Sequence, residues 1–227
     1  MGLGTWLLDL LFPPKCAFCR ALLEQSGDGV CPACRRALPW SDEKPRKCTF
    51  IRGYVAPLYY EEKVRRSVLR YKFENSPALG NTFGGLIAEK LRKEPDMTWD
   101  MITWVPLSRR RERDRGYDQA RLLAESAAAA LNTRAVPLLR KERNAPPQSH
   151  LRTPEARRAN VSGCYSLLPA TGVEGKRILL VDDVITTGAT VSECARMLML
   201  AGASEVRAAA LACRRKDHAE THHSEGT

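Results

Sequence analysis

One short segment, residues 178–190, constrains the fold more than any other part of the 227-residue chain. It begins with the apolar run Ile-Leu-Leu-Val, which predicts a strand that is buried on both faces. Asp182 and Asp183 follow this run, then a loop rich in threonine and glycine, and apolar spacing predicts a helix from Thr190 onward. A buried strand that leads through a loop into a helix is typical of an α/β fold with a mostly parallel sheet.

The loop of this segment has the chemistry of a phosphate site. The N-terminus of a helix presents backbone N–H groups and the positive end of the helix dipole, which together suit an anion. Thr186, Thr187 and Thr190 add hydroxyl donors, and Gly188 lets a ligand approach the backbone closely. The preceding carboxylates can accept hydrogen bonds from vicinal hydroxyls at the carboxyl end of the strand, where ligands of open α/β sheets bind. The segment therefore predicts a ligand of the ribose 5-phosphate type.

Three other interpretations of the acidic pair stay open. A Walker B magnesium site would need a GxxxxGK[ST] motif, which the sequence lacks. A response-regulator receiver carries its acidic pair near the N-terminus and has no comparable Thr-Gly loop. An ordinary strand–loop–helix unit could use the carboxylates only to cap the helix.

Four of the eight cysteines form two CxxC pairs, Cys16 with Cys19 and Cys31 with Cys34. Each pair turns two thiolates toward one point, and two such pairs make the tetrahedral sulfur site that structural zinc prefers. Two disulfides or a redox CxxC are the alternatives, but the sequence shows no secretory signal and the duplication favours a metal. We therefore predict a structural zinc site. Cys48 is single, and the other three cysteines lie beside apolar residues and are expected in the core.

These patterns divide the chain into three parts. Residues 1–50 are predicted to form the zinc module, with a short apolar helix over residues 6–11 and a polar linker over residues 41–47. Residues 51–213 are predicted to form the α/β domain, and residues 214–227 a disordered polar tail. Within the α/β domain we expect helices over residues 61–73, 83–91, 119–131 and 190–201, and strands over residues 101–105, 135–139, 178–181 and 206–212.

The net charge of +10 favours a polyanionic partner, such as nucleic acid, a phosphorylated small molecule or an acidic membrane surface. Residues 109–158 hold thirteen Lys and Arg against six Asp and Glu. With Tyr117 and Tyr165 available for stacking, this stretch is a candidate groove for single-stranded DNA, and a solvated charged loop is the alternative. No apolar run is long enough to span a membrane, and we expect a cytoplasmic protein.

Residues 178–190 also resemble the motif that binds phosphoribosyl pyrophosphate (PRPP) in type I phosphoribosyltransferases. Further stretches are similar to the ComF family, namely LFPPKC (11–16), YKF (71–73), VPL (105–107), RDRGYDQ (113–119), PPQ (146–148) and RRANV (157–161). On these motifs the chain is identified as a member of the ComF family up to about Arg214. It departs from the family pattern at Ser108, where His is usual, and at Tyr117 and Asp118, where Phe and Asn are usual. It also lacks a second set of CxxC pairs, so a second zinc site is not expected.

The resemblance implies a type I phosphoribosyltransferase fold, a mostly parallel sheet flanked by helices, with a small N-terminal zinc ribbon. It implies that PRPP binds with Mg²⁺ and that Asp182 and Asp183 are the catalytic carboxylates, which hold the ribose and favour an oxocarbenium-like transition state. The other implied PRPP contacts are Lys72, Pro106, Leu107, Ser108, Arg113, Arg115, Thr186, Thr187, Gly188, Ala189 and Thr190.

The family is tied to DNA uptake during natural transformation, and the related GntX proteins to the use of DNA as a nutrient. Phosphoribosyl transfer is one hypothesis for the activity, with no acceptor named by the sequence. The alternative is a non-catalytic protein that binds single-stranded DNA, or an adaptor that docks a helicase or pore component of the DNA-uptake machinery.

Overall fold

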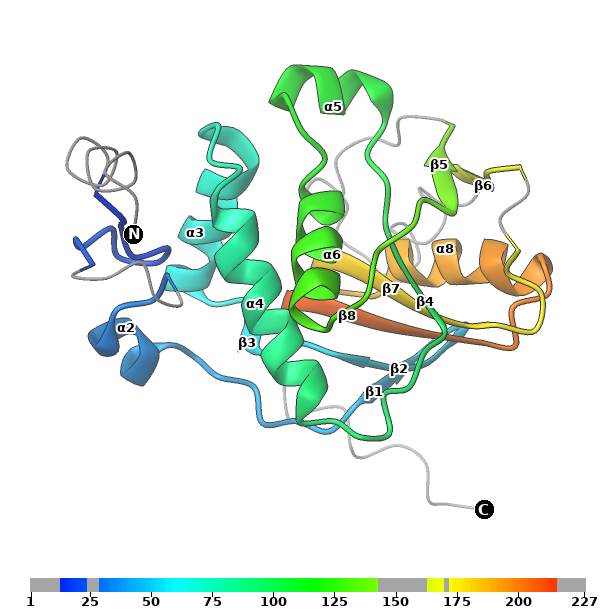
Figure 1. Cartoon of the computed structure of the whole chain (residues 1–227), viewed down its shortest axis with the longest axis horizontal. Coiled ribbons are helices and arrows are strands. Elements are labelled where there is room, and N and C mark those ends of the chain that lie inside the picture. The colour runs from blue at the N-terminus through cyan, green and yellow to red at the C-terminus, as the bar shows by residue number, and fades with distance from the viewer. Residues whose placement is uncertain (1–12, 24–28, 143–162, 170–171, 216–227) are drawn as a thin grey trace, which may run out of the picture.

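The computed structural model describes residues 13–23, 29–142, 163–169 and 172–215. The predicted N-terminal helix, the PPQ and RRANV motifs and residues 216–227 of the predicted tail lie outside the described residues. Within the described residues, a mostly parallel sheet lies between two layers of helices (Figure 1). This arrangement confirms the predicted α/β fold class.

Six strands form the central sheet in the order β1-β2-β8-β7-β4, and β3 also pairs with β8. Their bounds are Arg46–Cys48 (β1), Ile51–Val55 (β2), Leu58–Tyr59 (β3), Met101–Trp104 (β4), Arg177–Ile185 (β7) and Glu205–Cys213 (β8). The pairs are parallel except for β1 with β2 at the edge. Val181 lies opposite both Trp104 and Ala209, so β7 lies inside the sheet and its carboxyl end shares an edge with those of β4 and β8.

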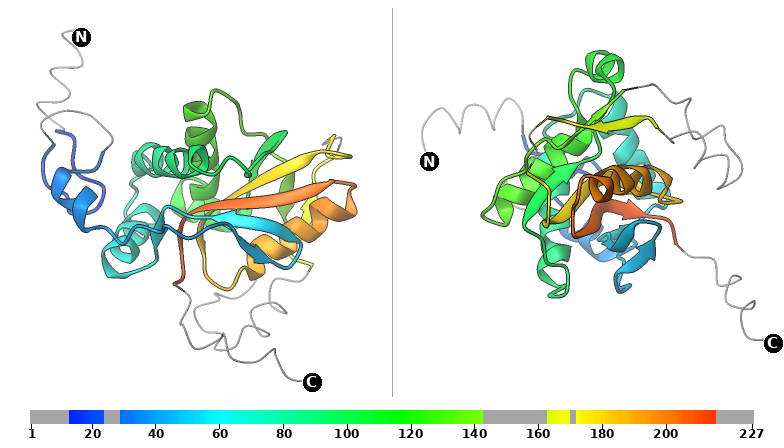
Figure 2. Two further views of the ribbon diagram at one scale, coloured as in Figure 1. Left: turned by 90° about the horizontal axis from the view of Figure 1, so that it is seen from below. Right: turned by 90° about the vertical axis from the view of Figure 1, so that its right-hand side faces the viewer.

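Alternate residues of β7 face two different cores. Leu179 and Val181 pack with α3 (Glu62–Phe73), α4 (Leu79–Arg92) and α6 (Gln119–Ala130). Ile178 and Leu180 pack with α8 (Ala189–Leu200), which covers the other face of the sheet (Figure 2). Because both faces are covered, the strand must be apolar on both sides, as its sequence indicates. The four predicted helices are confirmed, with ends that differ by up to four residues.

The predicted strand over residues 135–139 is wrong in its position. Ala135 makes only an isolated bridge to Ile102. The strand of this region is β5 (Leu139–Lys141), which pairs with β6 (Tyr165–Leu167) in a separate two-stranded sheet. Pro137 has no N–H group to donate to a ladder, which explains why pairing begins only after it. The predicted linker over residues 41–47 is shorter in the structure, because its last residues belong to β1.

The cysteine module packs directly on the α/β domain. Its residues Ala17 and Phe18 lie in the same core as α3 and α4, and the ring centroids of Phe18 and Phe83 are 5.7 Å apart. Arg70 of α3 donates hydrogen bonds to the backbone carbonyls of Ala17 at 2.6 Å and Phe18 at 3.2 Å. The second CxxC pair lies at the short helix α2 (Pro32–Ala37). Among the helices described here, none has both the length and the apolar character that a membrane span requires.

Candidate functional site

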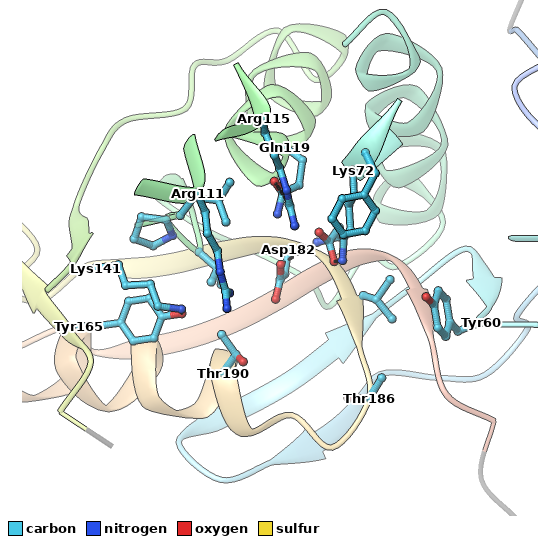
Figure 3. Close-up of a pocket in the computed structure, with 16 residues that line it drawn as sticks. Tyr60, Lys72, Arg111, Arg115, Gln119, Lys141, Tyr165, Asp182, Thr186 and Thr190 are labelled. Carbon is cyan, nitrogen blue, oxygen red and sulfur yellow. Dashed lines mark hydrogen bonds and ion pairs between the residues drawn. The ribbon is translucent and has the colours of Figure 1, made fainter. Parts of the chain in front are cut away.

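A cavity of about 440 Å³ opens at the carboxyl edge of the sheet (Figure 3). The end of β7 and the chain that follows β4 both contribute to its wall, as expected for an open α/β sheet. Eight of the residues predicted from the sequence line it together, namely Lys72, Pro106, Leu107, Arg115, Asp182, Asp183, Thr186 and Thr190. The tertiary structure therefore brings together residues from four separate parts of the chain.

The other predicted residues do not line the cavity. Thr187, Gly188 and Ala189 complete the loop and the first turn of α8. Ser108 is buried, and its hydroxyl accepts a hydrogen bond from the Arg111 N–H at 3.4 Å, so it caps the short helix α5 (Arg109–Arg115). Arg113 of α5 is exposed. Their contacts with PRPP stay predictions.

The two carboxylates of β7 differ in their surroundings. Asp183 is buried and forms an ion pair with Lys72, with 2.7 Å between Nζ and Oδ1. The backbone N–H of Asp183 donates to Oδ1 of Asp182 at 2.8 Å. Burial and the charge of Asp183 raise the pKa of Asp182 to about 8, against the opposing effect of Lys72. Near neutral pH Asp182 therefore retains a proton, and the pair can both accept and donate hydrogen bonds to a diol.

The loop after β7 turns sharply at Gly188, where φ is +76° and the residue is the N-cap of α8. A side chain at Gly188 would place its Cβ 2.3 Å from Sγ of Cys48, a residue of the edge strand β1. Both the positive φ and this contact require glycine. The Gly188 carbonyl accepts the N–H of Ser192 at 2.8 Å, so α8 begins at the loop and directs its first N–H groups toward the cavity edge.

Two cationic residues that sequence reasoning missed, Arg111 and Lys141, also line the cavity. Nζ of Lys141 donates to the Tyr165 hydroxyl at 3.0 Å and lies 4.9 Å from the centroid of that ring. Burial, together with the nearby charge of Arg111, lowers the pKa of Lys141. With Lys72 and Arg115 included, four cations oppose two carboxylates in the cavity wall, which favours a polyanionic ligand.

No pattern in the sequence marks Lys141 as a site residue. It meets Tyr165 only because β5 pairs with β6, where Lys141 lies opposite Tyr165 in the register. Arg111 is one of several arginines in a basic stretch, and only its place one turn before Arg115 on α5 shows that both face the cavity.

The four cysteines Cys16, Cys19, Cys31 and Cys34 form one cluster, in which their Sγ atoms all lie within 4.8 Å of one another. Sγ of Cys19 is 3.6 Å from Sγ of Cys31. A tetrahedral zinc ion with Zn–S bonds of about 2.3 Å would place its sulfur ligands about 3.8 Å apart. The cluster therefore fits a structural zinc ion bound by four thiolates.

The electrostatics of the cluster also favour a cation. Burial opposes ionisation, yet backbone N–H groups of Cys19, Cys31 and Phe18 lower the pKa of Cys16 to about 6. Burial and the three neighbouring sulfur atoms raise the pKa of Cys34. Four thiolates at this spacing repel one another strongly unless a bound cation compensates their charge. In the part of the chain that the structure describes, this is the one group of metal-binding side chains found.

Fold and site together define a phosphoribosyltransferase-type α/β domain that carries a four-cysteine ribbon. Two family models match the corresponding parts of the chain, the phosphoribosyl transferase domain over residues 118–225 and the double zinc ribbon domain over residues 7–51. The chain thus combines a phosphoribosyl transferase domain with a zinc ribbon domain, and in this combination it is similar to the ComF/YhgH family.

Characterised relatives match most of the chain. Competence protein ComFC of Bacillus subtilis (strain 168) is 29% identical over 212 residues, which cover 87% of this chain and 84% of ComFC. DNA utilization protein YhgH of Salmonella typhi is 28% identical over 225 residues, covering 87% of this chain and 96% of YhgH. Among solved structures, a glutamine PRPP amidotransferase from B. subtilis overlaps 59% of this chain and 26% of its own, with 27% identity and a TM-score of 0.39.

Proposed function

We propose that the cavity binds PRPP together with Mg²⁺, and that the protein serves competence or DNA utilization, the roles that the names of its relatives give for them. One observation carries the PRPP proposal: a loop at a helix N-terminus, an acidic pair and four cationic side chains meet around one cavity. PRPP contains the matching groups, a 5-phosphate, a ribose diol and a diphosphate. All eight cysteines lie within the described residues and none is joined in a disulfide there, which supports a reducing location such as the cytoplasm.

Each end of the ligand has a suitable place in this arrangement. The 5-phosphate would bind the loop between Thr186 and Thr190, and the ribose hydroxyls would bind Asp182 and Asp183. The diphosphate would lie toward the cationic side chains, of which Arg111 reaches toward Thr190 in Figure 3. The negative charge of the acidic pair would favour positive charge that develops at C1 of the ribose.

The oxygen-rich floor of the cavity also fits Mg²⁺, a hard cation that prefers carboxylate, phosphate and water oxygens. Asp182 and Asp183 are the side chains that would hold it near the ribose. Bound there, Mg²⁺ would neutralise charge on the diphosphate leaving group. Lys72, already paired with Asp183, would keep the acidic pair oriented toward the ligand.

The decisive test replaces both carboxylates. At a concentration about 100-fold above its Kd, PRPP with MgCl₂ should raise the unfolding free energy of the native protein by about 2.7 kcal/mol. The double variant Asp182→Asn with Asp183→Asn should lose this gain, because the diol and the cation lose their acceptors. Differential scanning fluorimetry, with and without PRPP, measures the shift.

Asp100→Asn is the matched control for this test. Asp100 also pairs with a cation, Arg177 at 2.7 Å, but it lies at the amino ends of β4 and β7, on the opposite edge of the sheet. This variant should keep the full PRPP shift. An undiminished shift in the double Asn variant would refute the proposed site.

Contact with single-stranded DNA is a second candidate function, and α5 is the observation that favours it. This helix has the sequence RRRERDR, contains no buried residue and stands beyond the carboxyl edge of the sheet, at the top of Figure 1. Each phosphate contact makes the affinity for a single strand fall with salt, with a slope of about −0.7 on logarithmic axes. An exposed arginine helix therefore suits a nucleic acid backbone.

We expect the affinity for a single-stranded oligonucleotide to fall about tenfold when salt rises fourfold, as two to three phosphate contacts require. Replacement of Arg109, Arg110 and Arg113 by Gln should flatten this dependence, whereas the double Asn variant should still bind. Fluorescence anisotropy over a salt series measures both. A salt-independent affinity of the native protein would rule this function out.

A further inference from the structure

Residues 107–118, here called the α5 segment, leave the sheet after β4 and return at the start of α6. The segment contains α5, which has no buried residue and stands beyond the carboxyl edge of the sheet (Figure 1). It brings Arg111 and Arg115 to the cavity wall, where both side chains point inward (Figure 3). Because α5 buries no residue in the core, the positions of these two guanidinium groups depend on how the ends of the segment are held.

Asp118 joins the two ends of the α5 segment. Its Oδ2 accepts the backbone N–H of Leu107 at 2.8 Å, eleven residues earlier in the chain. Its Oδ1 accepts the N–H groups of Ala120 at 3.0 Å and Arg121 at 3.2 Å, which caps α6. One carboxylate therefore bonds both the first turn of α6 and the loop that leaves β4.

The β4 end of the segment depends on this bond. The N–H of Val105 donates to the Val181 carbonyl at 2.9 Å, and Pro106 has no N–H group. Leu107 is therefore the first residue after the pairing of β4 with β7 whose N–H can hold the loop, and Asp118 accepts it.

The α6 end of the segment is held by the core instead. Gln119 and Ala120 are buried at the start of α6. The hydroxyl of Tyr71, a fully buried residue of α3, donates to the Gln119 carbonyl at 2.9 Å. Asp118 is 6% exposed, and burial raises the pKa of its carboxyl group, an effect that the N–H of Leu107 opposes. Asp118 therefore connects the loop after β4 to an end that is packed in the core.

We propose that Asp118 is a positioning residue for a diphosphate group: it holds the two ends of the α5 segment together, so that Arg111 and Arg115 face the ligand. Asp118 touches no part of the ligand and acts only through these arginines. Side chains that are already positioned lose less conformational entropy on binding than side chains that must first be ordered. This role rests on the proposed function, because the diphosphate of PRPP would lie toward the same cationic side chains.

Two substitutions separate the bond to Leu107 from the helix cap. Serine is a good N-cap, so Asp118→Ser should keep the cap of α6, but its one side-chain oxygen cannot also accept the Leu107 N–H. Its Tm should fall by no more than about 4 °C, as the loss of one hydrogen bond gives in a domain of this size. Asp118→Asn has the size of the native residue and one acceptor oxygen fewer, and should lie between Asp118→Ser and the native protein.

Inorganic diphosphate is the probe, because it tests the cationic side chains without the ribose. Isothermal titration calorimetry should show a Kd about tenfold higher in Asp118→Ser, since two arginine side chains must then be ordered on binding. Amide hydrogen exchange by NMR should be about tenfold faster or more at Leu107 in this variant, while Ala120 keeps its protection. A role in capping alone would change Tm and the exchange of Ala120, and would leave Leu107 and the diphosphate Kd unchanged.

Asp100→Ser is the matched control. Asp100 also accepts a backbone N–H from a distant strand, that of Arg177 at 2.8 Å, but it does so at the opposite edge of the sheet. This variant should lose stability and bind diphosphate with the native Kd. Equal diphosphate affinity in the native protein and Asp118→Ser, or unchanged exchange at Leu107, would overturn the positioning role.

The PRPP shift is measured on the same variants to separate the two proposals. If Asp118→Ser weakens the binding of diphosphate but the native protein shows no PRPP shift, the positioning role stands for a diphosphate group and the PRPP proposal fails. If PRPP stabilises the native protein and Asp118→Ser equally, the PRPP proposal stands and the positioning role fails.

Discussion

Replacement of Cys34 by Ser is expected to lower the unfolding free energy by about 5 kcal/mol, which for a domain of this size corresponds to about 10–20 °C in Tm. The side chain of Cys34 is buried, and its Sγ lies within 4.8 Å of the other three sulfur atoms. Without a fourth thiolate the cluster binds zinc weakly, and the free energy of metal binding no longer contributes to folding. A chelator added to the native protein should have a similar effect.

The loss of stability in Cys34→Ser should extend from the zinc ribbon to the cavity. Phe18 packs against Phe83 in the core shared with α3 and α4, and Arg70 of α3 donates to two carbonyls of the ribbon. Lys72 and Phe73, which line the cavity, come from the last turn of the same helix. A disordered ribbon would therefore loosen α3, and the stabilisation by PRPP should decrease in Cys34→Ser.

Cys48→Ser is the control, since Cys48 lies outside the cluster and its Sγ is 3.1 Å from Oγ of Ser192, a contact that serine can replace. Zinc content by mass spectrometry should be about one ion per chain in the native protein and in Cys48→Ser, and well below that in Cys34→Ser. An unchanged Tm together with full zinc content in Cys34→Ser would contradict the four-thiolate site.

Asp182→Asn should make the protein more stable than the native form at pH 8, by about 2 kcal/mol, and should at the same time weaken PRPP binding. The pKa of Asp182 rises from an ordinary 3.8 to about 8 in the folded state, because of burial and the charge of Asp183. Between these two pH values the folded state binds more protons than the unfolded state. Its stability therefore falls as pH rises from about 4 to about 8, and an amide at this position removes the loss.

A difference of one unit between the pKa values of the folded and unfolded states corresponds to about 1.4 kcal/mol of unfolding free energy. We expect the difference in unfolding free energy to be smaller than the full pKa shift of Asp182 would give, because water entry and relaxation around an ionised Asp182 offset part of it. Urea unfolding of both proteins across this pH range measures the difference, which should grow with pH and level off above about 8. A difference that does not change with pH would show that Asp182 ionises normally in the folded protein.

Asp100→Asn should change the stability of the protein in the opposite direction. Its partner Arg177 lowers the pKa of Asp100, so this carboxylate stabilises the fold above its ordinary pKa, and the stabilisation is lost as pH falls. The variant should therefore be less stable than the native protein at neutral pH and approach it in acid. The two variants together separate a carboxylate that stabilises the fold from one that is kept for the site at a cost in stability.

Local sequence determined the elements that surround the site. The apolar run before Asp182 predicts β7 because a strand covered on both faces must be apolar on both sides, and the turn at Gly188 follows from its positive φ. The spacing of Cys16, Cys19, Cys31 and Cys34 predicts the cluster for an equally local reason, because each CxxC turn brings its own two thiolates together.

Tertiary structure alone decided which distant side chains meet at that loop. Arg111, Lys141, Tyr60 and Phe73 come from four different elements or connections, and strand pairing and helix packing bring them to one cavity. The raised pKa of Asp182 has the same origin, since it depends on burial by the packed layers and on the charge of Asp183, against the opposing charge of Lys72. Patterns of neighbouring residues report local conformation, whereas the proximity and desolvation of distant groups arise only when the layers pack.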